Sequence, residues 1–380
     1  MNIDYYKAPS PCYILDAERL RDNLRLISHV REESGAEIIL AFKAFAMWSA
    51  FPIVREYFTK STASSLCEAR LAYEELGGLA HTYAPVYTDA EFSKIAECSS
   101  HITFNSLGMY ERFHTKAKQA DHPISLGLRV NPEFSVVETD LYNPCTPGSR
   151  LGVVASQLPS QLPDDIEGLH VHCLCECGSE ELEQLMDSMS CKFAQWLPQV
   201  KWVNFGGGHL MTRKGYDVER LIRIIKDFSS KWNVKVILEP GSAFGWETGE
   251  LVATVEDIVE NGNIKTAMLN VSFACHMPDC LEMPYKPHIL GAYHDPVEGK
   301  PTYRMGGNSC LSGDYVGEWS FDKELKVGDR IVFLDMIHYT IVKTTMFNGV
   351  THPSLAIHDA KHGLRVVRTF GYEDYKNRMG

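Results

Sequence analysis

The chain has 380 residues, of which 44% are hydrophobic and 23% are charged. These fractions exclude a disordered or collagen-like chain, and the length predicts two or three domains or one large barrel with an additional domain. A formal net charge of −12, without any run of lysines and arginines, argues against nucleic acid and anionic membrane surfaces as partners.

No stretch approaches the ~20 consecutive apolar residues of a membrane span, and the first residues lack the charged and apolar regions of a signal peptide. The 11 cysteines are odd in number and scattered along the chain. A chain of this length needs no disulfides for stability, so we expect reduced thiols and a cytoplasmic protein.

Short apolar runs alternate with amphipathic helical patterns over the first part of the chain. Asp16 is expected to cap the first helix, which Gly35 ends. Further helices are predicted over 50–58, 65–76, 89–98, 107–120, 179–197 and 218–231. Eight strands are predicted over 38–42, 60–64, 81–86, 101–105, 125–131, 168–173, 201–205 and 234–239. Several are apolar throughout, as in strands covered on both faces.

Eight strands that alternate with helices predict a (β/α)8 TIM barrel, with an open doubly wound sheet as the alternative. After Gly245 the pattern changes to strand-like runs separated by proline and glycine, over 251–259, 266–272, 300–305, 330–333 and 338–346. We therefore expect a barrel over 12–245 and a β-rich, sandwich- or barrel-like domain over 246–380, which residues 1–11 could join. Residues 133–150 show no period and are predicted to form a surface loop.

Chemistry in such a barrel lies at the C-terminal ends of the strands. Lys43 follows the first run, and a partly desolvated amine readily forms a Schiff base. Alternation places His170 and His172 on one side of the sixth run. Three glycines, 206–208, follow the seventh run and would let backbone N–H groups approach a phosphate. Glu239, followed by Pro240 and Gly241, ends the eighth run.

Each feature alone is compatible with a structural role, such as a strand-end lysine or an ordinary turn. Together they supply an amine, a ring to stack on, a phosphate cradle and a carboxylate for a heterocyclic nitrogen. This set is the one expected for pyridoxal phosphate held in a barrel.

These residues resemble the alanine-racemase-like class of pyridoxal-phosphate enzymes (fold type III), and more closely the ornithine/diaminopimelate decarboxylase group. The resemblance runs from Ser10-Pro11-Cys12-Tyr13-Ile14-Leu15-Asp16 to Met346-Phe347-Asn348-Gly349. It implies a homodimer with active sites composed across the interface. It implies these cofactor residues: Lys43 as the Schiff-base lysine, His172 on the ring, Glu239 at the pyridine nitrogen, Gly206, Gly207, Gly208, Gly241 and Tyr339 at the phosphate, and Arg129 and Glu68 along the cofactor's side.

The segment from Gly306 to Asp314 is similar to the loop that this group donates from the other subunit. The resemblance makes Cys310 the acid that reprotonates the α-carbon after carbon dioxide leaves. Asp314 closes the same loop and would face the substrate.

Three departures set this sequence apart. Leu311 stands where the diaminopimelate enzymes carry glutamate, and Leu174-Cys175 stands where they carry glycine and serine. Ser242 stands where the diaminopimelate and ornithine enzymes carry arginine. These changes remove a cation suited to a phosphate or a distal carboxylate, so neither diaminopimelate nor ornithine is the expected substrate.

Three stretches, 172–176, 271–279 and 281–285, look instead like the carboxynorspermidine decarboxylase family. That family converts carboxynorspermidine and carboxyspermidine to norspermidine and spermidine; Asn270 departs from the aspartate expected there. The implied substrate is an amino acid with a polyamine tail, whose ammonium groups need carboxylate partners when desolvated. The implied substrate-binding residues are Glu176, His276, Asp279, Asp314 and Glu68, with Glu282 as a further candidate.

Other hypotheses remain open from the sequence. A zinc site would draw on His170, His172, Cys173, Cys175 and Cys177, but neighbours on a strand point to opposite faces. A racemase would need a second base, usually a tyrosine, where this chain offers the Cys310 loop. A decarboxylase of another basic amino acid is the closer alternative, and a non-catalytic cofactor carrier would lack the β-rich domain.

Overall fold

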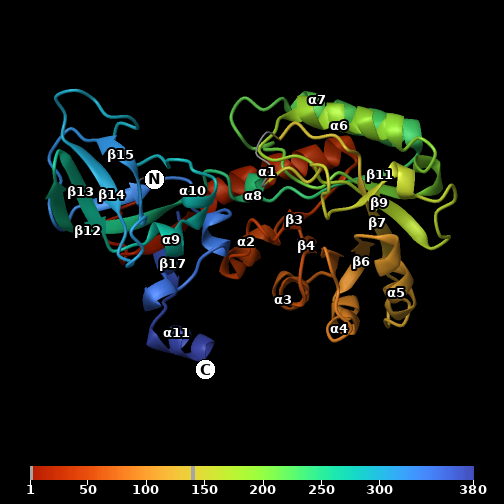
Figure 1. The fold of residues 1–380 in the computed structure, drawn as a ribbon, viewed down its shortest axis with the longest axis horizontal. Helices are drawn as coiled ribbons and strands as arrows, with labels where there is room; N and C mark the ends of the chain where they lie inside the picture. Colours follow the sequence, from red (N-terminus) through yellow and green to blue (C-terminus); the bar gives the residue numbers. More distant parts are fainter. Residues whose placement is uncertain (1–2, 138–141) are drawn as a thin grey trace. The chain divides into compact units, whose positions relative to one another are not determined.

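The computed structural model describes residues 3–137 and 142–380. The chain divides into two compact units, one of residues 22–244 and one of residues 1–21 with 245–380. Figure 1 follows the chain through both units.

The unit of residues 22–244 is built on a ring of parallel strands. Residues 37–41 form one strand position as two short pieces, β2 and β3, on either side of Ile39. β2 pairs with β11 and β3 pairs with β4, so the described strands close into a barrel. The order around the ring is β2 (Glu37–Ile38), β11 (Lys235–Leu238), β10 (Trp202–Asn204), β9 (Ile166–His170), β7 (Ser125–Asn131), β6 (Ser99–Phe104), β5 (Ala80–Tyr83), β4 (Ser61–Ala63) and β3 (Leu40–Ala41). The predicted (β/α)8 barrel is confirmed.

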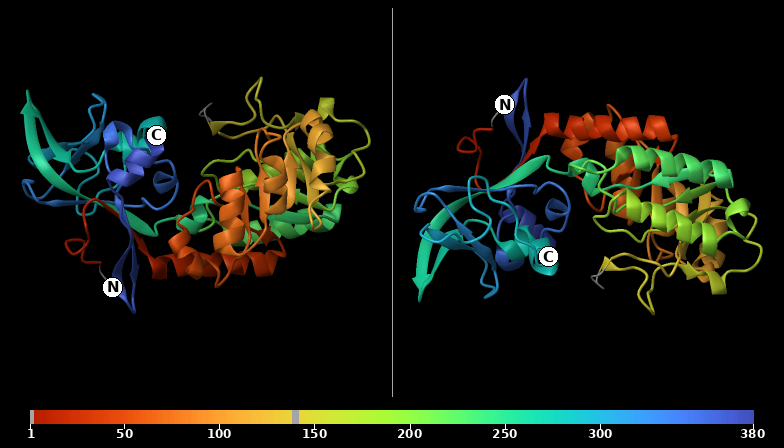
Figure 2. Two further views of the ribbon diagram at one scale, coloured as in Figure 1. Left: turned by 90° about the horizontal axis from the view of Figure 1, so that it is seen from below. Right: turned by 90° about the horizontal axis from the view of Figure 1, so that it is seen from above.

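Helices connect these strands and cover the outside of the barrel, where α6 and α7 lie side by side (Figures 1 and 2). Asp16 accepts the N–H groups of Glu18 and Arg19, at 2.9 and 3.1 Å, and Gly35 ends the first helix at φ 72°, as predicted. The helices are α1 (Ala17–Ser34), η1 (Trp48–Ala50), α2 (Phe51–Val54), α3 (Leu66–Leu71), η2 (Ala72–Leu76), α4 (Phe92–Glu97), α5 (Leu107–Ala117), η4 (Ala155–Gln157), α6 (Ser179–Lys192), η5 (Leu197–Gln199), α7 (Val218–Trp232) and α8 (Ser242–Gly245).

The predicted loop over 133–150 follows β7 and leads to the short strand β8 (Val153–Val154). Its described residues, 133–137 and 142–150, contain turns and no strand or α-helix. Residues 138–141 of this prediction lie outside the described residues.

The Trp202 side chain of β10 fills part of the barrel next to two glycines. A Cβ atom on Gly168 would lie 2.0 Å from the indole, and one on Gly127 would lie 2.3 Å from it. The indole Nε1 donates a hydrogen bond to Ser125 Oγ at 2.9 Å. Because the two glycines, on β7 and β9, have no side chains, there is space for this indole.

We expect Gly168→Ala to destabilise the protein by roughly 1–3 kcal/mol, because overpacking a filled core forces side chains from their positions. The shift of the urea unfolding midpoint measures this effect. Gly108→Ala is the matched control, since no atom lies within 4 Å of a Cβ there and alanine favours the α5 helix. Equal midpoints for the two variants would contradict the prediction.

The second unit contains a mixed sheet in which β12 is central. The strand order is β15 (Tyr315–Ser320), β14 (Thr302–Gly306), β13 (Ile264–Leu269), β12 (Gly249–Asn261), β1 (Cys12–Asp16), β17 (Ser354–Asp359) and β18 (Gly363–Arg368), and β16 (Arg330–Phe333) also pairs with β12. Its helices are short: α9 (Phe273–His276), α10 (Pro278–Glu282), η6 (Thr340–Val342), η7 (Phe347–Gly349) and α11 (Tyr372–Met379).

Four of the strands predicted after Gly245 correspond to β12, β13, β14 and β16. The strand predicted over 338–346 is wrong. Tyr339 has φ 47° and is followed by the 3-10 turn η6, so the chain cannot extend there despite its β-branched residues. The prediction assigned residue 12 onward to the barrel, whereas β1 pairs with β12 and β17 of the mixed sheet.

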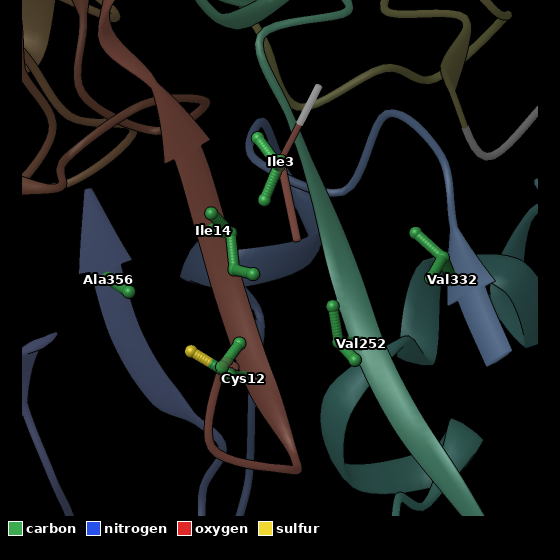
Figure 3. Packing of buried hydrophobic residues seen from close by; sticks show 7 residues of the cluster. Ile3, Cys12, Ile14, Val252, Val332 and Ala356 are labelled. Carbon is green, nitrogen blue, oxygen red and sulfur yellow. The ribbon is translucent and has the colours of Figure 1, made fainter. Parts of the chain in front are cut away.

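A buried cluster joins the N-terminal residues to this sheet. Ile3, Cys12 and Ile14 belong to one cluster with Val252, Val332 and Ala356, which lie on the strands β12, β16 and β17 (Figure 3). Burial raises the pKa of the Cys12 thiol to about 12, so it behaves as a small apolar residue. All 11 cysteines are free thiols. No described helix is long and apolar enough to cross a membrane.

Candidate active site

Lys43 and His172 meet at the C-terminal ends of β3 and β9. Lys43 Nζ lies 3.0 Å from His172 Nε2, and the backbone N–H of Gly207 donates to His172 Nδ1 at 3.0 Å. The Gly207 N–H donor makes Nδ1 the acceptor nitrogen of the neutral ring. Burial, with the nearby charges of Lys43 and Arg129, holds the pKa of His172 well below its usual range.

The glycine turn after β10 packs tightly against this histidine. A Cβ atom on Gly206 would lie 2.4 Å from His172 Nδ1, and one on Gly207 would lie 2.3 Å from the carbonyl oxygen of Glu239. Gly208 adopts φ 88°, and a Cβ there would lie 1.9 Å from the carbonyl oxygen of Leu174. The turn is therefore a packed structure that only glycines permit, and not a flexible linker.

Glu239 is a half-buried carboxylate that directly follows β11 and is held by Asn204. Asn204 Nδ2 donates to Glu239 Oε1 at 2.6 Å, while Asn204 Oδ1 accepts the Gly206 N–H at 2.8 Å. Burial raises the pKa of Glu239, against the lowering effects of Asn204, Lys43 and Arg129. Asn204 thus ties the carboxylate to the glycine turn, a role that the sequence analysis did not assign.

Arg129 places a buried cation beside this pair, with only 4% of its surface exposed, whereas Lys43 is exposed. Its Nη2 donates to the carbonyl oxygen of His172 at 3.1 Å, and its guanidinium lies 4.7 Å from the centre of the Tyr83 ring. Tyr83 in turn donates to Asn105 Oδ1 at 2.8 Å. Tyr83 and Asn105 were also missed: Tyr83 lies within the strand predicted over 81–86, and Asn105 ends the one predicted over 101–105.

Glu68, predicted to lie along the cofactor, makes hydrogen bonds at the start of a helix. Its carboxylate accepts the Ser64 N–H at 2.6 Å, and its own N–H donates to Ser65 Oγ at 3.2 Å, which together cap the start of α3. Burial is the main cause of its raised pKa, and Lys43 lowers it. Glu68 therefore lies within electrostatic reach of the Lys43 amine.

This cluster fits pyridoxal phosphate. Both ring nitrogens of His170 are buried without a hydrogen-bond partner among the described residues, and His170 Nε2 lies 3.7 Å from Glu239 Oε2. The arrangement combines an amine, a neutral ring, a carboxylate that faces unpaired polar atoms, and a glycine turn. Lys43 would hold the cofactor, Glu239 its ring nitrogen, and the glycine turn with Gly241 its phosphate.

Glu176, from the segment after His172, also belongs to this unit. It has φ 53°, and its carbonyl oxygen accepts a hydrogen bond from Arg213 at 3.2 Å. The cysteines in the same segment make other contacts. Cys173 Sγ lies 3.3 Å from Cys145 Sγ, and no group of three or more potential metal ligands is found within 3–137 and 142–380.

The remaining predicted residues lie in the unit with the mixed sheet. Cys310 is exposed, and its N–H donates to Asn348 Oδ1 at 2.8 Å. His276 is fully buried, and its Nδ1 accepts the Ser272 N–H at 3.1 Å. Tyr339 precedes η6 at its positive φ.

Two acidic residues of the α10 helix differ in their surroundings. Asp279 Oδ2 accepts the hydroxyl groups of Tyr285 and Thr340 at 2.9 and 3.1 Å, whereas Asp279 Oδ1 has no protein partner among the described residues. Glu282 forms an ion pair with Lys343.

Six histidines, four buried and two half-buried, predict that stability falls with acidification. Burial lowers the pKa of each below its usual 6.5, to about 4 for His101 and His209 and about 3 for His276. The others are His81, His170 and His172. Below pH 6.5 the unfolded chain binds more protons, at up to about 1.4 kcal/mol per histidine per pH unit, so folding stability declines.

The urea midpoint is therefore expected to fall from pH 7 to pH 5.5. Three carboxyl groups with raised pKa values, Glu68, Glu239 and Glu250, oppose this trend but are fewer. His101→Asn should flatten the profile in part. A midpoint independent of pH over this range would show that the histidines are accessible to protons in the folded state.

Comparison with known proteins agrees with the fold and with a pyridoxal cofactor. Residues 12–337 match the family model described as "Pyridoxal-dependent decarboxylase, C-terminal sheet domain", and the chain belongs to this family of pyridoxal-dependent decarboxylases. It is 48% identical to a carboxyaminopropylagmatine decarboxylase of Synechocystis sp., over 98% of this chain and 96% of that one. It is 47% identical to a carboxynorspermidine/carboxyspermidine decarboxylase of Campylobacter jejuni, over 98% and 99%.

A solved structure supports the same family assignment. The crystal structure of carboxynorspermidine decarboxylase from Campylobacter jejuni, complexed with norspermidine, superposes with a TM-score of 0.90 at 45% identity, covering 98% of this chain and 100% of that one. The predicted resemblance to pyridoxal-phosphate decarboxylases, including the carboxynorspermidine decarboxylases, is thus confirmed.

Proposed function

We propose that this protein decarboxylates carboxynorspermidine and carboxyspermidine to norspermidine and spermidine. The observation that carries the proposal is the near full-length similarity to the Campylobacter jejuni structure that binds norspermidine. The departures at Leu311, Ser242 and Leu174-Cys175 support it, because they separate this chain from the diaminopimelate and ornithine pattern.

The bound pyridoxal phosphate would supply the electron sink for the electrons left when carbon dioxide departs. Lys43 would attach the cofactor, with His172 fixing its amine at 3.0 Å. Glu239 would hold a proton on the ring nitrogen. Cys310 would then deliver a proton to the α-carbon of the substrate.

The polyamine tail requires carboxylate partners, and Asp279 is the best supported of those predicted. Its Oδ1 has no protein partner among the described residues, while Tyr285 and Thr340 hold its other oxygen. An ammonium group at Oδ1 would complete its coordination. We keep Glu176, His276 and Glu68 as further proposed substrate-binding residues.

We also propose a cytoplasmic homodimer in which Cys310 and Tyr339 complete the sites. In support, Cys310 is exposed on a loop of the mixed-sheet unit and therefore accessible to a partner. Sedimentation or light scattering tests the dimer. Mixing inactive Lys43→Ala with inactive Cys310→Ala subunits should restore part of the activity if the sites are composite.

A second candidate substrate is carboxyaminopropylagmatine, favoured by the 48% identity to the Synechocystis enzyme that bears this name. Its tail would end in a guanidinium group, which prefers a bidentate carboxylate partner, whereas the polyamine ends in an ammonium group.

Release of carbon dioxide from carboxynorspermidine, carboxyspermidine, carboxyaminopropylagmatine and diaminopimelate separates these candidates. We expect the highest kcat/KM with one of the first two and negligible turnover of diaminopimelate. A clear preference for carboxyaminopropylagmatine would assign the second function. Preference for diaminopimelate would refute both.

A further inference from the structure

Two consecutive backbone N–H groups of the Cys310 loop are held by side-chain oxygens. Ser309 N–H donates to Asp314 Oδ2 at 3.0 Å, and Cys310 N–H donates to Asn348 Oδ1 at 2.8 Å. Neither bond belongs to a helix or a sheet. The Leu311 N–H also donates to Ser309 Oγ, at 3.3 Å. The three bonds hold the peptide planes on both sides of Cys310, and hence the direction of its Cα–Cβ bond.

Asp314 is fully engaged in this loop. Only 5% of its surface is exposed, and its other oxygen, Oδ1, accepts the Ala274 N–H at 2.9 Å. A Cβ atom on Gly307 would lie 2.3 Å from the Asp314 carboxylate, so the glycine admits this side chain. The Asp314 carbonyl oxygen also accepts the Gly307 N–H at 2.7 Å.

Asn348 reaches Cys310 from a separate segment of the chain. Its φ of 57° is in the left-handed region, which asparagine tolerates better than most residues. The preceding segment is anchored at Thr345, whose N–H donates to the Cys275 carbonyl oxygen at 2.8 Å. A residue without an amide or carboxylate oxygen at 348 would leave the Cys310 N–H without this partner.

We infer that Asp314 and Asn348 are positioning residues for the Cys310 thiol, and that Asp314 acts through the loop and not by binding the polyamine tail. This inference rests on the proposed function, in which Cys310 is the proton donor. The sequence-based assignment placed Asp314 against the substrate, but its two oxygens already accept backbone N–H groups.

A displaced thiol has a distinct chemical consequence. Carbon dioxide would still be released, but the proton would be added to the cofactor and not to the substrate's α-carbon. Hydrolysis by one water would then give an aldehyde derived from the substrate. The amine nitrogen would remain on the cofactor as pyridoxamine phosphate, so the enzyme would lose its active cofactor.

Asn348→Gly is the informative variant, because glycine keeps the positive φ and removes only the acceptor. We expect kcat to fall about 10–10²-fold with little change in KM, as for a catalytic group displaced by about 1 Å. The fraction of turnovers that ends in pyridoxamine phosphate should rise, as followed in the absorption spectrum. Asn348→Asp, which keeps an acceptor oxygen, should recover part of the loss.

Asn233→Gly is the matched control, since Asn233 is a left-handed asparagine, at φ 53°, that ends the α7 helix. It should keep the wild-type kcat and product ratio. Cys310→Ala sets the reference and should retain the cofactor but lose most turnover. The rate at which iodoacetamide modifies Cys310, followed by mass spectrometry, reports the thiol's surroundings without substrate and should change in Asn348→Gly.

Asp314→Asn separates loop positioning from substrate binding. A loss in kcat at unchanged KM supports positioning, whereas a raised KM at unchanged kcat would show a contact with the polyamine tail and overturn the inference for Asp314. If the wild type is active and Asn348→Gly matches it in kcat, product ratio and alkylation rate, the inference for Asn348 is wrong. A wild type that decarboxylates none of the substrates refutes the proposed function itself, and with it the catalytic purpose of both residues.

Discussion

Lys43→Ala is expected to yield a colourless protein that has lost more than about 10³-fold of its decarboxylation rate. Lys43 lies at the end of β3, and its Nζ is 3.0 Å from His172 Nε2, the position where an amine can attach the cofactor's aldehyde. Without this amine the cofactor is held by non-covalent contacts alone. Absorption in the near-visible region after incubation with pyridoxal phosphate and dialysis, together with carbon dioxide release, measures both effects.

Lys201→Ala provides the control, since Lys201 is 74% exposed and forms an ion pair with Glu167 on the barrel surface. It should stay yellow and active. Lys43→Arg keeps the positive charge but cannot form the same bond, so it should resemble Lys43→Ala. A wild type that remains colourless with pyridoxal phosphate would refute the assignment of Lys43 and of the site around it.

The barrel could be predicted because its strands are short apolar runs at regular intervals. The break of the first strand at Ile39 could not be, because it depends on pairing with β11 and β4, which are distant in sequence. The strand predicted over 338–346 failed for a related reason. Composition there favours a strand, but the left-handed conformation of Tyr339 is set by its surroundings.

Some residues of the site could likewise be predicted from the sequence, and others could not. Lys43, His172 and Glu239 were predictable because strand order alone places residues at strand ends on one face of a barrel. Asn204 was missed although it ends β10 as a buried polar residue, a signal that the same rule could have used. Its importance lies in two hydrogen bonds to residues of other segments, and no periodicity shows these.

Glu239→Gln is expected to slow decarboxylation on the order of 10²–10³-fold, as for the loss of one preorganised electrostatic contact. Asn204 can still donate to the amide oxygen, as it does to Glu239 Oε1 at 2.6 Å, so the shape of the site is kept. What disappears is the carboxylate that would hold a proton on the cofactor's ring nitrogen. The ring would then withdraw electrons less strongly after carbon dioxide leaves.

The unfolding midpoint of Glu239→Gln distinguishes a role at the cofactor's ring nitrogen from a purely structural role. The pKa of Glu239 is raised by burial, which means that the folded protein bears a cost for its charge. A neutral glutamine removes that cost, so the unfolding midpoint of the apoenzyme should stay equal or rise while kcat falls. A variant that keeps its kcat, or one whose kcat and unfolding midpoint fall together, would show that Glu239 serves the fold and not the ring nitrogen.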